Sequence, residues 1–225
     1  MVVAVRARGL TRIFGQGASA VRALCDLDLD LEMGSFVVVR GPSGCGKSTL
    51  LNLAGLLDQP TNGILSIFNQ PVQDFKPDRA AEYRKQNIGF LFQDAGLIDK
   101  VTVLDTVTLP LTYRKVDPKT RKHKALAALE TVGLSHRVMA RTETLSGGER
   151  QRAGLARVLA CDPNILICDE PTASLDDNNS RMVIDHLIAA ARRDKLVLVS
   201  SHDPLVLDSA DHTVSLFRGM LVDQA

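Results

Sequence analysis

A glycine-rich segment carries the residues of the sequence best suited to phosphate chemistry. The run Gly41-Pro42-Ser43-Gly44-Cys45-Gly46-Lys47-Ser48 follows the apolar residues 36–39 and leads into residues 50–54, so it reads as strand, tight loop and helix. In that setting the loop amides and the helix N-terminus point at a phosphate, Lys47 reaches the outer phosphates, and the Ser48 hydroxyl can bind Mg²⁺. A chance glycine–lysine turn is the alternative, and the flanking elements weigh against it. The segment therefore predicts a nucleotide-phosphate site.

An acidic pair follows another apolar run. Residues 165–168 read as a strand buried on both faces, and Asp169 and Glu170 come directly after them. Ligands of open α/β sheets bind at the carboxyl ends of the strands. There Asp169 would hold Mg²⁺ through water, and Glu170 would polarise an attacking water. A strand that simply ends in charged residues is the weaker alternative beside a phosphate loop. His202 follows the similar run 196–201, so we expect it to contact the γ-phosphate.

A pair of adjacent glycines stands in a second candidate segment, Leu145-Ser146-Gly147-Gly148-Glu149-Arg150-Gln151-Arg152. Ser146 and Glu149 have the S-x-x-E spacing of a capping box, which predicts a helix that starts near Ser146. A cap alone does not require two glycines, because glycines cost helix stability. Close approach of the backbone to an anion at the helix N-terminus explains them better. The two interpretations are compatible, since a well-capped helix with exposed amides is a phosphate site.

Composition limits the class of protein. The 225 residues carry a net charge of +1 and are 45% hydrophobic. These values fit one large domain with a buried core and give no basic character that would indicate nucleic acid. The four cysteines lack C-x-x-C spacing, as expected for free thiols in a reducing compartment. The sequence has no signal-peptide pattern and no apolar run near the ~20 residues of a membrane helix. We expect a cytoplasmic protein that reaches a membrane only through a partner.

The remaining pattern predicts an α/β fold. We expect strands at residues 2–6, 24–31, 36–39, 64–68, 165–168 and 196–199. The runs without polar residues are typical of a parallel sheet covered by helices. Residues 102–160 read as mainly helical, with an amphipathic helix at 118–132 and another from Ser146 to a point before Pro163. We therefore predict a single domain at 1–225, with a core of 1–93 and 151–225 and a helical subdomain at about 94–150.

Together these segments resemble the ATP-binding-cassette (ABC) ATPases, and the resemblance covers essentially the whole chain. Residues 41–48 look like the Walker A motif, residues 145–149 like the ABC signature and residues 165–170 like Walker B. Ser174-Leu175-Asp176 resembles the D-loop, His202 the switch histidine, and Gln93 the Q-loop glutamine that touches Mg²⁺ and relays to the membrane partner. Phe14 stands where the family places an aromatic ring that stacks on adenine; a core phenylalanine is the alternative.

The resemblance implies a P-loop NTPase core with a mainly parallel sheet, an N-terminal antiparallel β subdomain and an inserted helical subdomain. It implies ATP and Mg²⁺ as cofactors. The implied catalytic residues are Glu170, His202, Lys47 and Gln93, and the implied metal-binding residues are Ser48, Gln93 and Asp169. The implied nucleotide contacts are Phe14, Gly41, Ser43, Gly44, Cys45, Gly46, Lys47, Ser48, Thr49, Ser146, Gly147, Gly148, Glu149 and Asp176.

Within the family, residues 101–111 and 145–152 look most like the lipoprotein-releasing, macrolide-efflux and cell-division branch. Position 149 is Glu where many members have Gln, and Cys168 stands where Ala is commoner. Ala173-Ser174 replaces the Gly-Asn that is common in this branch.

The resemblance also implies a mechanism with two copies of the chain. Residues 145–149 of one copy would close over ATP bound by the other, and this homodimer would drive a separate transmembrane permease of export or extraction type at the inner face of the cell membrane. A membrane complex that regulates cell-wall enzymes without transport stays open as an alternative. A chromosome-maintenance or DNA-repair head is disfavoured because the chain has no sustained heptad run. Leu97 and Ile98 are expected to line the socket for the permease, unless they pack beneath the helical subdomain.

Overall fold

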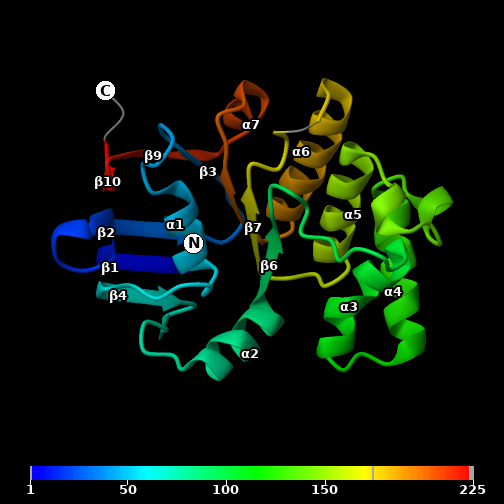
Figure 1. Ribbon diagram of the computed structural model, residues 1–225, viewed down its shortest axis with the longest axis horizontal. Helices are drawn as coiled ribbons and strands as arrows, with labels where there is room; N and C mark the ends of the chain where they lie inside the picture. Colours follow the sequence, from blue (N-terminus) through cyan, green and yellow to red (C-terminus); the bar gives the residue numbers. More distant parts are fainter. Residues whose placement is uncertain (1, 174, 223–225) are drawn as a thin grey trace.

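Two β-sheets share an apolar core in the computed structural model, which describes residues 2–173 and 175–222 (Figure 1). The antiparallel sheet has the order β2-β1-β4-β5, with strands β1 (Val3–Phe14), β2 (Val21–Glu32), β4 (Asn62–Ile67) and β5 (Gln70–Pro71). The larger sheet has the order β10-β9-β3-β8-β7-β6. Its strands are β3 (Phe36–Arg40), β6 (Ile88–Leu91), β7 (Ile165–Asp169), β8 (Leu196–Ser200), β9 (His212–Phe217) and β10 (Met220–Leu221).

The larger sheet is mainly parallel. Strands β9, β3, β8, β7 and β6 run in one direction, and β10 pairs antiparallel with β9. Strand β8 is buried throughout, and β3 and β7 are buried up to their last residue. This burial on both faces explains their continuous apolar sequence. The segments after β3, β7 and β8 leave the sheet at one edge, which is the edge where ligands of such sheets bind.

Helices cover the larger sheet. Their bounds are α1 (Lys47–Ala54), α2 (Pro77–Asn87), α3 (Val103–Tyr113), α4 (Pro118–Thr131), α5 (Gly147–Leu159), α6 (Asp177–Ala191) and α7 (Pro204–Asp208), with 3-10 helices η1 (Gly17–Ser19), η2 (Ser135–Arg137) and η3 (Thr142–Thr144). In Figure 1, α1 lies beside the antiparallel sheet, whereas α3, α4, α5 and α6 lie on the other side of the larger sheet.

Strand β3 divides its side chains between two apolar cores. Phe36 and Val38 pack into a cluster formed with α3, α4, α5 and α6. Val37 and Val39 pack into the opposite cluster, which contains α1 and the inner face of the antiparallel sheet. Successive side chains of a strand point to opposite faces, so this alternation places β3 between two cores. The phosphate loop therefore begins from one of the most firmly packed strands of the molecule.

The predicted α/β fold with a mainly parallel sheet, an antiparallel β subdomain and a helical insert is confirmed. Several elements are longer than predicted. Strand β1 continues to Phe14 because register shifts, including one between Ala7 and Leu10, absorb the residues that break its alternation. The predicted subdomain boundary at 150/151 falls within helix α5, so the division into 1–93, 94–150 and 151–225 stays a prediction.

Candidate functional site

The phosphate loop ends in a helix that has no side-chain cap. Gly46 is the N-cap of α1 with φ 110°, and no side chain accepts a hydrogen bond from the first turn. By contrast, side chains of Thr102, Asp117 and Ser146 cap α3, α4 and α5. The first amides of a helix have no partner within the helix. Those of α1 are therefore directed into the loop as donors for an anion.

Close packing around the loop fixes its shape. A β-carbon on Gly46 would lie 2.4 Å from the Ala23 carbonyl oxygen, and one on Gly41 would lie 2.2 Å from the Leu216 carbonyl oxygen. The Gly219 amide donates to the Cys45 carbonyl at 3.0 Å, and the Cys25 amide donates to the Gly219 carbonyl at 2.7 Å. Strand β2 and the β9–β10 hairpin thus hold the loop from outside.

Lys47 lies over the loop that precedes it. Its Nζ donates to the carbonyl oxygens of Gly41 at 2.8 Å and Pro42 at 3.3 Å. An ammonium held at this place, together with the α1 amides, gives a concave donor set that suits the oxygens of a polyphosphate. The predicted loop residues Ser43, Gly44, Ser48 and Thr49 all belong to this loop and the first turn of α1.

The acidic pair lies at the end of β7 beside Ser200 of β8. Asp169 Oδ1 accepts a hydrogen bond from the Ser200 hydroxyl. Glu170 has the left-handed φ of 47°, and its amide donates to the Ser200 carbonyl at 3.0 Å. Its Oε1 lies 3.1 Å from His202 Nδ1, and the Glu170 side chain is 15% exposed against 81% for His202. The structure thus brings together Asp169, Glu170 and His202, as the sequence predicts.

The donor atoms at this edge fit Mg²⁺. Ser48 offers a hydroxyl, Asp169 a carboxylate and Gln93 an amide, and all three can present the oxygen ligands that Mg²⁺ prefers. Within residues 2–173 and 175–222, no group of three or more His, Cys, Asp or Glu side chains could hold a metal ion. A sparse donor set fits a Mg²⁺ that keeps water and substrate phosphate oxygens among its ligands.

Gln93 and Glu170 line the same small cavity. The cavity has a volume of about 250 Å³, and Gly147 and Leu175 also line it. Gln93 is exposed and follows β6, so it lies between the larger sheet and the helical segment. The structure therefore places Gln93 near the acidic edge, which is the edge of the larger sheet where Asp169 and Glu170 follow β7.

The glycine pair of the signature starts helix α5. Ser146 and Glu149 form the predicted capping box: the Glu149 amide donates to Ser146 Oγ at 3.2 Å, and the Ser146 amide donates to Glu149 Oε2 at 2.8 Å. Arg137 grips the same carboxylate with Nε at 2.8 Å from Oε1 and Nη2 at 3.2 Å from Oε2. The Arg137 bond, followed by the Ser146 amide, lowers the pKa of Glu149 to about 2. Both Glu149 oxygens are used within the chain, and its predicted contact with nucleotide stays a prediction.

Two further predicted residues have clear local roles. Asp176 caps α6 by accepting from the Asn179 amide at 2.9 Å, and this bond lowers the pKa of Asp176. Phe14 is 42% exposed at the end of β1, and the Arg12 guanidinium lies 4.4 Å from the centre of its ring. The half-exposed ring disagrees with the core alternative, but Arg12 already covers it, so the predicted stacking of Phe14 on adenine stays a prediction. Ser174, the first residue of the predicted D-loop, lies outside the described residues.

The phosphate loop and the signature lie on opposite sides of the larger sheet. Helix α1 packs into the core that the larger sheet shares with the antiparallel sheet. Helix α5 packs on the other face of the larger sheet, into the core formed with α3, α4 and α6 (Figure 1). One chain therefore offers the signature amides away from its own phosphate loop.

Some residues of the site were not found from the sequence. Ser200 touches both acidic residues, and Thr172 donates to Asp203 at 2.8 Å across the loops after β7 and β8. Arg137 braces the start of α5 from the preceding segment. A hydroxyl at the end of an apolar strand run was the available signal for Ser200.

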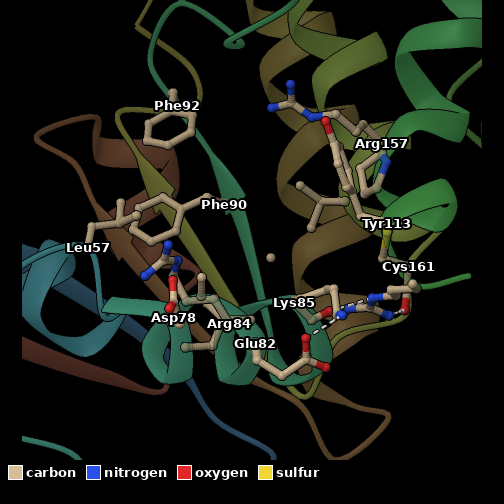
Figure 2. Close-up of a pocket in the computed structure, with 16 residues that line it drawn as sticks. Leu57, Asp78, Glu82, Arg84, Lys85, Phe90, Phe92, Tyr113, Arg157 and Cys161 are labelled. Atoms are coloured by element: carbon tan, nitrogen blue, oxygen red, sulfur yellow. Dashed lines mark hydrogen bonds and ion pairs between the residues drawn. The ribbon is translucent and has the colours of Figure 1, made fainter. Parts of the chain in front are cut away.

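An apolar groove of about 560 Å³ lies between α2, β6, α3 and α5. Figure 2 shows Phe90 and Phe92 on one wall and Tyr113 on the other. The two phenylalanine rings stack with centroids 5.0 Å apart. Arg157 also lines the groove, and its Nη2 donates to the carbonyl oxygen of Ala95 at 2.9 Å, close after Gln93.

The segment after Gln93 is only partly exposed. Leu97 packs against the core of the helical side, as the packing alternative expects, whereas Ile98 is half exposed. Neither residue lines the apolar groove. No helix among the described residues is long and apolar enough to cross a membrane.

Comparison with known proteins identifies the family. Residues 24–173 match the ABC transporter family. The chain is 38% identical over 213 residues to the uncharacterized ABC transporter ATP-binding protein YvrO of Bacillus subtilis, covering 95% of this chain and 93% of that protein. It is 35% identical to the macrolide export ATP-binding/permease protein MacB of Hyphomonas neptunium, covering 98% of this chain but only 34% of that protein.

A solved structure agrees with these sequence matches. The dimeric post-hydrolysis state of the ATP-binding cassette MJ0796 bound to ADP and Pi has a TM-score of 0.92 to this chain at 32% identity, covering 98% of this chain and 97% of that one. A phosphate loop, an acidic edge and a capped glycine pair thus stand in a fold shared with a nucleotide-bound cassette. The chain belongs to the ABC transporter family, as an ATP-binding ATPase cassette.

Proposed function

We propose that the chain hydrolyses MgATP in a head-to-tail homodimer and thereby drives a separate transmembrane subunit. The observation that carries the proposal is the separation of the signature from the phosphate loop on opposite sides of the larger sheet. Each phosphate loop gains the signature amides only when a second copy supplies them. The dimeric structures of MJ0796 support this arrangement by analogy.

The proposed chemistry assigns a role to each side chain at the edge. Lys47 and the first amides of α1 bind the phosphates and neutralise their charge. Mg²⁺, held by Ser48, Asp169 and Gln93, would withdraw charge from the phosphate oxygens. Glu170 accepts a hydrogen bond from the attacking water and orients it. His202, 3.1 Å from Glu170 and largely exposed, donates to the γ-phosphate.

The transmembrane subunit is proposed to dock in the apolar groove of Figure 2. A cytoplasmic helix of that subunit with apolar side chains would fit against Phe92 and Tyr113, with the partly buried Phe90 beneath them, because exposed aromatic surface marks interaction sites. Arg157 links the groove wall to the segment after Gln93, so an occupant lies near the catalytic edge. In this proposal the cassette works in the cytoplasm at the inner face of the membrane.

Export or extraction is the proposed type of transport. The name of the related MacB protein, which describes macrolide export, supports that type over import. A complex that transmits motion to cell-wall enzymes through its membrane subunit would use the same cassette. Identification of the membrane partner would distinguish export from such regulation.

We further propose that residues of about 94–150 move relative to the core when the dimer closes.

ATP hydrolysis is tested by two variants that fail in different ways. Glu170→Gln should bind ATP normally yet lose most turnover, because the acceptor that orients water is lost while the phosphate contacts remain. Lys47→Ala should weaken nucleotide binding itself. Turnover by phosphate release and affinity by titration calorimetry separate the two effects. Near wild-type turnover in Glu170→Gln would remove Glu170 from its role.

Dimerisation is tested by light scattering on Glu170→Gln with and without ATP. We expect a monomer without nucleotide and a dimer with ATP and Mg²⁺. A monomer at high protein concentration with saturating MgATP would contradict the shared site.

Docking is tested by the double variant Leu57→Ser, Tyr113→Ser, which removes exposed apolar side chains from opposite walls of the groove. It should retain basal ATPase activity and lose the membrane protein that co-purifies with the wild type. Leu126→Ser, at an exposed leucine of α4 outside the groove, is the matched control. Full retention of the partner by the double variant would place the docking surface elsewhere.

A further inference from the structure

Ser200 is a fully buried hydroxyl at the catalytic edge. It is the last residue of β8, and in the register of the parallel pair it stands directly opposite Asp169 of β7. Its exposed fraction is 0%. Buried hydroxyls carry hydrogen bonds in folded proteins, and the identity of the partners shows what the group holds in place.

Both partners of this hydroxyl belong to the acidic pair. Ser200 Oγ donates to Asp169 Oδ1, and it accepts from the Glu170 amide at 3.2 Å. The same amide also donates to the Ser200 carbonyl oxygen at 3.0 Å. One side chain on β8 therefore bridges two consecutive residues that extend from β7.

The bond to Asp169 fixes a carboxylate. Among the side chains of the described residues, Ser200 is the hydrogen-bond partner of Asp169. It occupies Oδ1 and holds the group in one rotamer, with Oδ2 left to accept from another donor. The carboxylate is therefore preorganised, with Oδ2 as the oxygen available to a ligand at the sheet edge.

The bond to Glu170 supports an unfavourable backbone conformation. A non-glycine residue at a φ of 47° is disfavoured, and such residues persist where their surroundings hold them. The two bonds from the Glu170 amide to Ser200 are the contacts that do so. This conformation directs the Glu170 side chain to His202.

We propose that Ser200 is a positioning residue for ATP hydrolysis: its hydroxyl orients Asp169 toward Mg²⁺ and holds the backbone that aims Glu170 at the attacking water. The proposal rests on the proposed roles of Asp169 and Glu170. It does not place Ser200 in contact with substrate, because the hydroxyl is buried behind the two acidic residues.

The test compares Ser200→Ala with Ser200→Cys in the full chain. Alanine removes the hydroxyl, whereas cysteine fills the space but donates only weakly. Loss of a residue that orients a metal ligand costs about 10- to 100-fold in metal affinity or activity, so we expect kcat at saturating MgATP to fall at least about tenfold in both variants. Wild-type kcat in Ser200→Cys would show that the site needs only volume, and would overturn the proposal.

A binding measurement provides a readout besides activity. The affinity for a fluorescent ATP analogue is measured by titration, once in the presence of Mg²⁺ and once in EDTA. The variants should match the wild type in EDTA and lose much of the affinity that Mg²⁺ adds. An unchanged Mg²⁺ dependence together with unchanged kcat would overturn the proposal.

Ser35→Ala controls for the loss of any buried hydroxyl. Ser35 is buried before β3 and donates to the Glu32 carbonyl at 2.5 Å, remote from the acidic edge. The Ser35→Ala variant should be less stable but keep the wild-type kcat. A fall in kcat equal to that of Ser200→Ala would show that lost stability explains the Ser200 effect.

The Asp169→Asn variant tests the underlying function. Retained turnover in Asp169→Asn would refute the proposed function, whereas lost turnover in Asp169→Asn with normal turnover in Ser200→Ala would refute the Ser200 proposal alone.

Discussion

The ion pair between Arg137 and Glu149 should make the stability of the chain depend on pH in a defined window. The hydrogen bonds from Arg137 and then from the Ser146 amide lower the pKa of Glu149 from the ordinary 4.5 to about 2. A shift of this size corresponds to about 3 kcal/mol as an upper bound for all causes together. Arg137 is 36% exposed, so solvent screens the pair, and its own share is about 1–2 kcal/mol.

Arg137→Ala should therefore lower the free energy of unfolding by about 1–2 kcal/mol at pH 7. The folded pKa of Glu149 lies below its unfolded pKa, so its contribution is present above pH 4.5 and is lost as the pH falls toward 2. The difference between variant and wild type should shrink over the same window. This stability difference is measured by urea unfolding at several pH values. Far-UV circular dichroism detects the unfolding, because the chain has no tryptophan for fluorescence.

Arg181→Ala is the matched control. Arg181 is exposed on α6 and makes no ion pair with the residues that the structure describes, so its removal should change stability little at any pH. A loss in Arg137→Ala that is equally large at pH 3 and pH 7 would show that packing, not charge, is the cause. A double-mutant cycle with Glu149→Gln should return the same 1–2 kcal/mol as a coupling energy, about the value assigned above. No loss at pH 7 would show that Ser146 alone secures the helix start.

Three further variants test other parts of the site and its support. Gly46→Ala should weaken ATP binding in calorimetry, because the new β-carbon would lie 2.4 Å from the Ala23 carbonyl oxygen at a φ of 110°; unchanged affinity would contradict it. Ser146→Ala should cost about 1 kcal/mol in urea unfolding through the lost cap, and should weaken the ATP-dependent dimer in light scattering. Arg114→Ala, which removes guanidinium bonds to the carbonyls of Lys85 and Cys161, should cost about 2–3 kcal/mol in thermal melts; an unchanged melting temperature would refute this.

The predictable parts of the molecule are those with local signals. The glycine and lysine spacing of the phosphate loop determines a backbone shape within eight residues, and its flanking strand and helix are readable from composition. The runs at β3, β7 and β8 are apolar because helices or the second sheet cover both faces. Once these strands are placed, the location of Asp169, Glu170 and His202 at one edge follows from parallel topology.

The parts that escaped prediction depend on register or on weak local patterns. Helix α2 is polar, and of its residues Ala80 alone is buried, so no apolar stripe indicates it. The bond between Ser200 and Asp169 joins residues 31 positions apart, and it exists because β7 and β8 pair in one register instead of the next. The hydrogen bond from Arg137 to Glu149 likewise depends on the path of the segment that leads into α5, and no sequence spacing predicts that path.

The bracing of the phosphate loop by Gly219 has a consequence for the order in which the chain is made. Strand β3 leaves the ribosome early, but its neighbour β9 begins at His212, opposite Val37. At about 5–20 residues per second, synthesis of the intervening stretch takes roughly 10–35 s. For most of that interval β3 lacks both of its sheet neighbours, β8 and β9, and the phosphate loop lacks its outer support. A nascent chain can therefore complete the support of its phosphate loop only after the β9–β10 hairpin has been added to the sheet.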